Sequence, residues 1–83
     1  MTPYYVYILH CADGSLYTGI TTDMESRVMV HNRGKGAKYT RSRLPVHLVY
    51  HEVCEDRSAA LRREIEIKAM TREEKLQLVA AGC

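Results

Sequence analysis

The chain has 83 residues, of which 46% are hydrophobic and 27% charged, and its formal net charge is +2. A chain of this length and composition is an ordinary globular protein with one modest core, which we expect to be a single domain over residues 1–83. Because it has no basic-then-apolar leader and no apolar run long enough to cross a bilayer, we expect it in the cytoplasm.

The first predicted element is a β-hairpin. Residues 4–11 are rich in β-branched and aromatic residues, which is typical of a strand. Asp13-Gly14 signals a turn, and Leu16 to Ile20 form the returning strand. The first strand is the most apolar in the chain, so we place it in the middle of the sheet.

The length of the hairpin turn decides which tyrosines lie on the same face. A two-residue Asp-Gly loop would pair Tyr17 with His10. A three-residue loop, with Gly14 in the left-handed region, would instead pair Tyr17 with Leu9 and place Gly19 beside Tyr7. We favour the second arrangement, in which Tyr7 and Tyr17 share a face, although the sequence alone permits both.

A helix is predicted next, followed by a basic loop. Thr22 and Glu25 fit a capping box that opens a helix running to about Asn32. Residues 34–44 then form a loop, and no acid occurs anywhere in residues 26–51. Cations without counter-charges create a local positive field that attracts nucleic acid or another polyanion. The cations of this stretch are Arg27, Arg33, Lys35, Lys38, Arg41 and Arg43.

The second half of the chain adds one strand and two helices. A strand is predicted over residues 46–53 and a helix over residues 58–70. Thr71 and Glu74 form a second capping box, which opens a last helix that ends before Gly82. The order β-β-α-β-α-α predicts an α+β domain with a three-stranded antiparallel sheet and flanking helices. The cysteines, Cys11, Cys54 and Cys83, contain no CxxC pair and are expected to be free thiols.

Both longer helices carry charged or polar residues on a predicted apolar face. Arg27 and His31 share a face with Met24 and Val28. In the later helix the face consists of Leu61, Glu64, Ile65 and Lys68, whereas Glu66 points elsewhere and is expected to be solvated. A charge on an inward face must be paired or line a cleft. Two interpretations stay open: a structural Arg27–Glu64 ion pair with His31 at the edge of the core, or a catalytic site.

The arrangement of these residues resembles the GIY-YIG nuclease superfamily. Its two motifs read here as Tyr5-Val6-Tyr7 and Tyr17-Thr18-Gly19. The similarity extends through "YVYILHCADGSLYTGIT", "HNRGKGAKYTR" and "ALRREIEIK", and so covers nearly the whole chain. It resembles the catalytic module of the excision-repair nuclease UvrC and, most of all, the short stand-alone bacterial GIY-YIG proteins. Tyr5 occupies the position where the family name has glycine.

The resemblance implies a role for each matching residue. Tyr7 and Tyr17 would be the signature tyrosines, Arg27 the catalytic arginine, and Glu64 the glutamate that binds one Mg²⁺ or Mn²⁺. His31 resembles a catalytic histidine found one turn after that arginine in several members. Gly19 would be the signature glycine at the substrate side. The further residues expected to contact the DNA backbone are Lys35, Lys38, Tyr39, Thr40 and Arg41.

The implied reaction is metal-assisted hydrolysis of a DNA phosphodiester, with a role in DNA repair or recombination. Arg27 would neutralise charge on the phosphorus, and one of the two tyrosines, Tyr7 or Tyr17, would deprotonate water. Tyr39 would stack on a base. The alternatives left open are a non-catalytic nucleic-acid-binding module, an RNA-directed protein, and a nuclease subunit that needs a protein partner for activity or selectivity.

Overall fold

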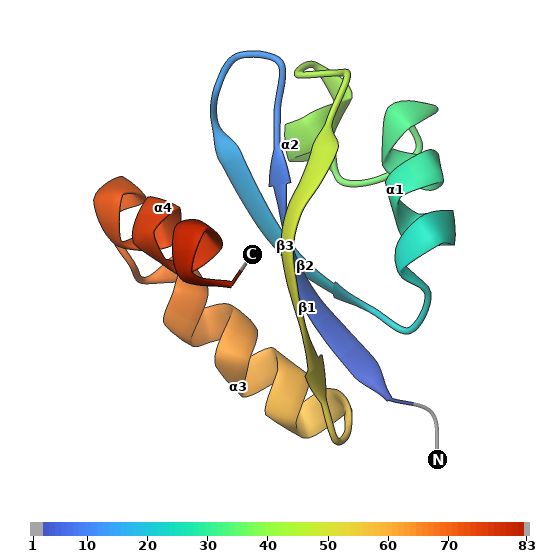
Figure 1. Cartoon of the computed structure of the whole chain (residues 1–83). Helices are drawn as coiled ribbons and strands as arrows, with labels where there is room; N and C mark the ends of the chain where they lie inside the picture. The colour runs from blue at the N-terminus through green and yellow to red at the C-terminus, as the bar shows by residue number, and fades with distance from the viewer. Residues whose placement is uncertain (1–2, 83) are drawn as a thin grey trace.

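The computed structural model describes residues 3–82 and shows a three-stranded antiparallel sheet with helices on both faces (Figure 1). The α+β class is therefore confirmed. The strands and helices, in chain order, are β1 (Tyr4–His10), β2 (Leu16–Thr21), α1 (Met24–Asn32), α2 (Lys38–Arg41), β3 (His47–Cys54), α3 (Arg57–Lys68) and α4 (Arg72–Ala81).

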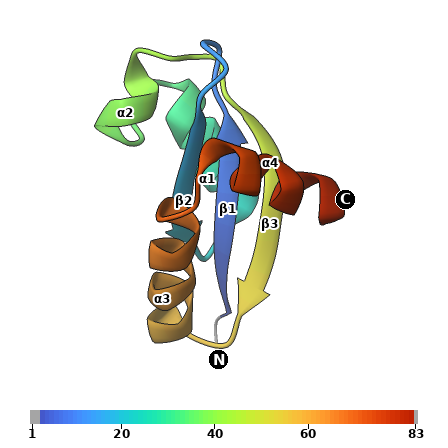
Figure 2. The ribbon, with the colours of Figure 1, turned by 90° about the vertical axis from the view of Figure 1, so that its left-hand side faces the viewer.

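Strand β1 lies in the centre of the sheet, whose strand order is β2-β1-β3, as the sequence predicted. Its successive side chains point to opposite faces. Val6 and Ile8 pack with α3 and α4, whereas Tyr7 and Leu9 pack with α1 and the segment that leads into β3. Figures 1 and 2 show the resulting three layers, with α1 and α2 on one face of the sheet and α3 and α4 on the other.

The hairpin has the three-residue loop that the sequence favoured. Gly14 has a φ of 85°, in the left-handed region that glycine adopts readily. Strand β1 pairs with β2 so that Tyr7 lies opposite Gly19 and Leu9 lies opposite Tyr17. Tyr7 and Tyr17 therefore share the face of the sheet that α1 covers.

The start of α1 differs from the prediction. Its N-cap is Asp23, whose carboxylate accepts a hydrogen bond from the Ser26 backbone N–H at 3.2 Å. The predicted Thr22–Glu25 capping box is wrong because two N-cap candidates adjoin, and the aspartate takes the role. The second capping box is confirmed, since Thr71 and Glu74 bond each other's backbone at the start of α4.

The basic loop contains a helical turn that the sequence did not predict. This turn, α2, has Ala37 as its N-cap and Ser42 as its C-cap. A hydrogen bond and ion pair from Arg43 to Asp13, with Nε 2.9 Å from the carboxylate, join the segment after α2 to the hairpin loop. Asn32 bonds both backbone groups of Val46, which ties the end of α1 to the approach to β3.

The buried stripe of α3 also differs from the prediction. Ala60 and Ile67 are fully buried, whereas Ile65 is 66% exposed. The inward face is thus rotated away from the predicted line through Leu61 and Ile65. Glu64 still lies mostly covered, with 17% of its side chain exposed, and the Glu66 side chain is 65% exposed, as expected.

Within residues 3–82, no helix is long and apolar enough to span a membrane. Cys11 and Cys54 are free thiols, as predicted. Cys83, expected to be free as well, lies outside the described residues.

Candidate active site

Tyr7, His31 and Arg27 meet between β1 and α1. The Tyr7 hydroxyl oxygen lies 3.0 Å from His31 Nε2, and Arg27 Nε donates a hydrogen bond to the same oxygen at 3.4 Å. Tyr7 is 1% exposed and His31 is fully buried. Arg27 and His31 are four residues apart on α1, so the helix presents both toward the same tyrosine.

Burial favours the neutral form of both groups of the central hydrogen bond. Burial raises the pKa of Tyr7, and its effect prevails over the hydrogen bond from Arg27, which lowers this pKa. Burial is also the main reason why the pKa of His31 lies below its ordinary value, and the Arg27 charge lowers it further. Both shifts therefore favour a phenol next to a neutral imidazole over the charged forms.

The other nitrogen of His31 contacts Thr40 on α2. His31 Nδ1 lies 2.7 Å from Thr40 Oγ1, which in turn donates to the Ala37 carbonyl at 3.0 Å. Thr40 was expected to contact DNA, but it is fully buried, so this expectation is corrected. A Cβ added at Gly36 would overlap the His31 ring at Nδ1, so the basic loop packs its backbone directly on the imidazole.

Tyr17 joins the same cluster through its ring. Its ring centroid lies 5.4 Å from that of His31 and 6.4 Å from that of Tyr7. None of the hydrogen bonds found in residues 3–82 uses the Tyr17 hydroxyl. The ring also stacks on Tyr39, with centroids 5.8 Å apart, and the Arg43 guanidinium lies 4.0 Å from the Tyr39 centroid. Tyr39 thus already has two partners, and a stacked base would have to replace one of them.

Gly19 serves this cluster by lacking a side chain. A Cβ at this position would lie 2.5 Å from the Tyr7 hydroxyl oxygen. Gly19 is itself buried, so its structural role is to leave room for the Tyr7 ring, rather than to meet a ligand.

Arg27 and Glu64 form no ion pair with each other. In the described part of the chain, Arg27 Nε bonds Tyr7, and neither terminal nitrogen of its guanidinium is in a hydrogen bond or ion pair. Glu64 instead pairs with Lys68, one turn later on α3, at 3.5 Å. Burial is the main cause of the raised Tyr7 pKa, and the Glu64 charge contributes to it in the same direction.

The side chains near Glu64 limit which metal ions this carboxylate can bind. Residues 3–82 contain no cluster of three or more His, Cys, Asp or Glu side chains suited to a metal ion. A single carboxylate fits an ion that keeps most of its waters and completes its shell with phosphate oxygens, as Mg²⁺ does. It does not fit Zn²⁺, which needs three or four protein ligands. The side chain of Lys68, which pairs with Glu64, is half exposed.

The remaining expected substrate contacts lie on the outside of the same loop. Lys35, Lys38 and Arg41 are exposed, and within the described ranges none of them is paired with an acid. Arg43, by contrast, is half-buried and neutralised by Asp13, so its charge is less available to a polyanion. The loop therefore presents free cations close to the Tyr7–His31 pair.

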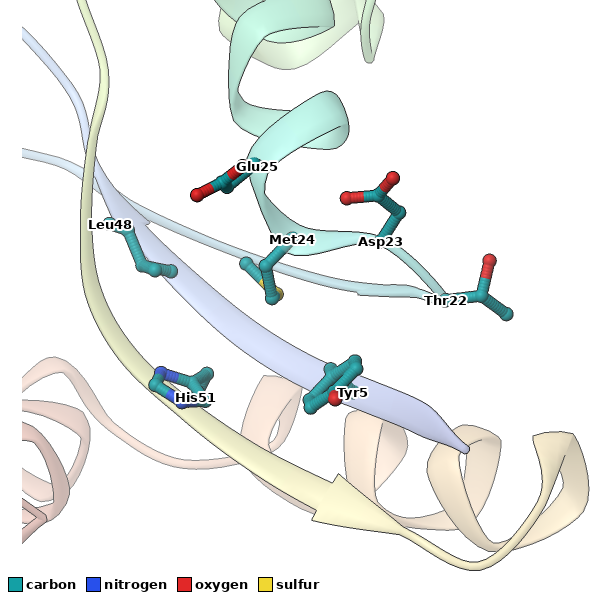
Figure 3. Close-up of a pocket in the computed structure, with 7 residues that line it drawn as sticks. All are labelled: Tyr5, Thr22, Asp23, Met24, Glu25, Leu48 and His51. Carbon is teal, nitrogen blue, oxygen red and sulfur yellow. The ribbon is translucent and has the colours of Figure 1, made fainter. Parts of the chain in front are cut away.

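An open cleft of about 390 Å³ lies elsewhere, between the start of α1 and β3 (Figure 3). Tyr5 lines it and meets His51 edge to face, with ring centroids 6.3 Å apart. The tyrosine that replaces the motif glycine therefore lines this cleft and is in none of the contacts described for Tyr7.

The sequence did not predict that Thr40 points inward or that Gly36 packs on His31. Neither residue lies in a local sequence pattern that could indicate a contact with a histidine several residues away.

The chain is similar in sequence and structure to known proteins. The model of the GIY-YIG catalytic domain matches residues 3–77. A UPF0213 protein of Staphylococcus aureus (strain Mu3) is 58% identical over 95% of this chain and 96% of its own length. Two solution structures are similar: a UPF0213 protein of Bacillus halodurans (49% identity, TM-score 0.62, 95% of this chain and 84% of that one) and a protein of E. faecalis (42%, 0.66, 98% and 86%).

Proposed function

Because this chain belongs to the GIY-YIG family of nuclease domains, we propose that it is a metal-dependent DNA endonuclease. The observation that carries the proposal is the single oxygen of Tyr7, which meets both His31 and Arg27 within hydrogen-bond distance. A structural Arg27–Glu64 ion pair, the plain alternative for these charges, is not formed. The proposal includes a biological role in DNA repair or recombination.

Tyr7 is the tyrosine that we assign to proton transfer. Its hydroxyl lies 3.0 Å from an imidazole nitrogen that accepts a proton when His31 carries its own hydrogen on Nδ1. A proton taken from the attacking water can then be balanced by one passed to His31. Tyr17 contacts its neighbours through ring faces and edges instead, which suits a role in holding the sugar or the attacking water. We prefer Tyr7 to Tyr17 for this role because of the geometry of its hydroxyl, not because of a pKa.

Arg27 is assigned to the scissile phosphate. With Nε held by Tyr7, its two terminal nitrogens can bind two phosphate oxygens in the fork geometry that a guanidinium offers. The positive charge then neutralises the charge that develops on the phosphorane-like transition state. Because the site is largely buried, this interaction is stronger than it would be in water.

Glu64 would hold one Mg²⁺ or Mn²⁺, as the family implies and as its single-carboxylate setting permits. A bound divalent ion supplies Lewis-acid stabilisation of the leaving oxygen. With only one protein ligand, affinity for the ion should be weak until DNA adds phosphate oxygens.

DNA binding would rest on the exposed cations of the basic loop. Lys35, Lys38 and Arg41 contact phosphates without reading sequence, so affinity should fall steeply as salt rises. A protein partner that supplies selectivity is compatible with this arrangement.

The test compares cleavage of labelled single-stranded, duplex and branched DNA with Mg²⁺ or Mn²⁺. Wild type is set against Glu64→Gln and Arg27→Met, with Glu66→Gln as the matched control. Glu66 lies on the same helix, but its side chain is mostly solvated. We expect metal-dependent cutting in wild type and control, and a loss of about 10²-fold or more in both site variants.

Two outcomes would end the proposal. If wild type binds DNA without cutting any substrate, the non-catalytic binding module becomes the better interpretation, unless activity appears on adding protein captured from lysate. If all four proteins cut alike, the activity does not come from this site. Competition with RNA of the same sequence separates a DNA-directed protein from an RNA-directed one.

A further inference from the structure

The hydrogen-bond chain through His31 has a direction that follows from counting protons. Thr40 has one hydroxyl hydrogen and two neighbours, the Ala37 carbonyl and His31 Nδ1. A carbonyl can only accept, so Thr40 donates to Ala37. Its lone pair is then left for Nδ1–H of His31. His31 Nε2 is consequently unprotonated, and it accepts the hydrogen of the Tyr7 hydroxyl.

The opposite tautomer satisfies fewer groups. With the proton on Nε2, His31 would donate to Tyr7, which already accepts from Arg27 Nε. The hydrogen of the buried Tyr7 hydroxyl would then have no acceptor among its described neighbours, and the Thr40–Ala37 bond would be lost. Buried donors without acceptors are rare and costly in folded proteins. In the first tautomer, every donor of this hydrogen-bond series has an acceptor: Arg27 Nε, the Tyr7 hydroxyl, His31 Nδ1 and the Thr40 hydroxyl.

We propose that Thr40 is a positioning residue that fixes His31 as the Nδ1–H tautomer, so that Nε2 is free to accept the Tyr7 proton. The hydroxyl of Thr40 acts through His31 and does not touch substrate. In the other tautomer, His31 Nε2 would carry a hydrogen and donate it to the Tyr7 oxygen. The tyrosine could then not pass its own proton to His31. The consequence for catalysis rests on the proposed nuclease function, but the tautomer itself does not.

The location of Thr40 gives this role a link to substrate binding. Thr40 lies on α2 between Tyr39 and Arg41, both exposed, while its own side chain is fully buried against His31. The short helix thus presents the expected DNA contacts outward and the tautomer-setting hydroxyl inward. Gly36, which packs on the same imidazole ring, holds the other side of the loop against it.

The test measures the His31 tautomer by ¹⁵N NMR of the imidazole nitrogens in the full chain, at a pH where the ring is neutral. Thr40→Val keeps the side-chain shape but removes the hydroxyl, and Thr40→Ser retains it. Thr18→Val is the matched control, because Thr18 is also buried and its hydroxyl has no hydrogen-bond partner within residues 3–82.

Wild type, Thr40→Ser and Thr18→Val are expected to show an unprotonated Nε2. Thr40→Val should show a substantial Nε2–H population. An Nε2-protonated His31 in wild type overturns the proposal, even if Thr40→Val does not fold. An unchanged tautomer in a folded Thr40→Val overturns it as well.

Cleavage provides the second readout. Thr40→Val should lower kcat by about 10²-fold while the Kd for DNA stays within about twofold of wild type, and Thr40→Ser should restore most of the rate. If wild type never cuts DNA, the proposed function fails, yet the NMR result still decides on Thr40. If the tautomer changes but kcat does not, the catalytic consequence is refuted.

Discussion

Replacing Gly19 by alanine tests whether the Tyr7 ring is held as tightly as the structure indicates. The new Cβ would lie 2.5 Å from the Tyr7 hydroxyl oxygen and 2.7 Å from Cζ, well inside ordinary contact. The ring would have to retreat by about 1 Å to regain normal van der Waals separation. It is 1% exposed and bonded at its hydroxyl, so it has little free space to enter.

The expected cost follows from two effects. Inserting a methyl group into a packed core costs about 1–3 kcal/mol, and disturbing the buried hydrogen bond to His31 adds about 1 kcal/mol. We therefore expect Gly19→Ala to lower the free energy of unfolding by about 2–4 kcal/mol. Urea denaturation followed by circular dichroism measures this loss.

Gly14→Ala serves as the control within the same hairpin. Its φ of 85° makes a side chain costly by about 1–2 kcal/mol, but a Cβ there would meet no other atom within 4 Å. Both variants should be less stable, and only Gly19→Ala should shift the ring resonances of His31. A Gly19→Ala protein within about 0.5 kcal/mol of wild type, with unchanged His31 resonances, would refute the tight packing.

Three further predictions concern charge. Lys68→Met removes the cation that competes for Glu64, so Mn²⁺ should bind a few-fold more tightly by titration, and unaltered affinity would argue against a metal at this carboxylate. Arg27→Met should raise the pKa of His31, measured by NMR titration, because a positive charge is removed; burial should still keep this pKa below its ordinary value. Burial raises the pKa of Glu52, but its side-chain hydrogen bonds prevail and lower it below 4.5. The ionised Glu52 carboxylate therefore stabilises the fold above about pH 4.5, and this stabilisation is lost as the pH falls through the lower pKa of the folded state. Glu52→Gln should consequently weaken the dependence of Tm on pH below about 4.5.

The sequence was sufficient to predict what local pattern controls. The alternation of β1, the Gly14 turn and the capping box at Thr71 each depend on a few adjacent residues, and the structure confirms all three. The central place of β1 followed from its apolar composition. These features specify the sheet, and with it the shared face of Tyr7 and Tyr17.

Features that depend on contacts between residues distant in the sequence could not be predicted from local sequence patterns. Thr40 reads as one more polar residue among cations, and its burial follows only from the meeting of α2 with His31. Ile65 was placed inward by its apolar character, yet packing of α3 against the sheet uses Ala60 and Ile67. At the start of α1, adjacent residues compete for one N-cap position, and their sequence does not decide between them.

The three-residue hairpin loop has a consequence for how this protein can be altered. Because faces alternate along a strand, removing or adding one residue between Cys11 and Ser15 would move Tyr17 and Gly19 to the layer of α3. A substitution in the loop does not change its length, so it leaves Tyr17 and Gly19 on the same face of the sheet as Tyr7. The chain should therefore keep the shared face of Tyr7 and Tyr17 through exchanges in this loop, even destabilising ones such as Gly14→Ala, while losing the candidate site to a single insertion or deletion. A library that randomises loop length rather than loop composition would expose this asymmetry.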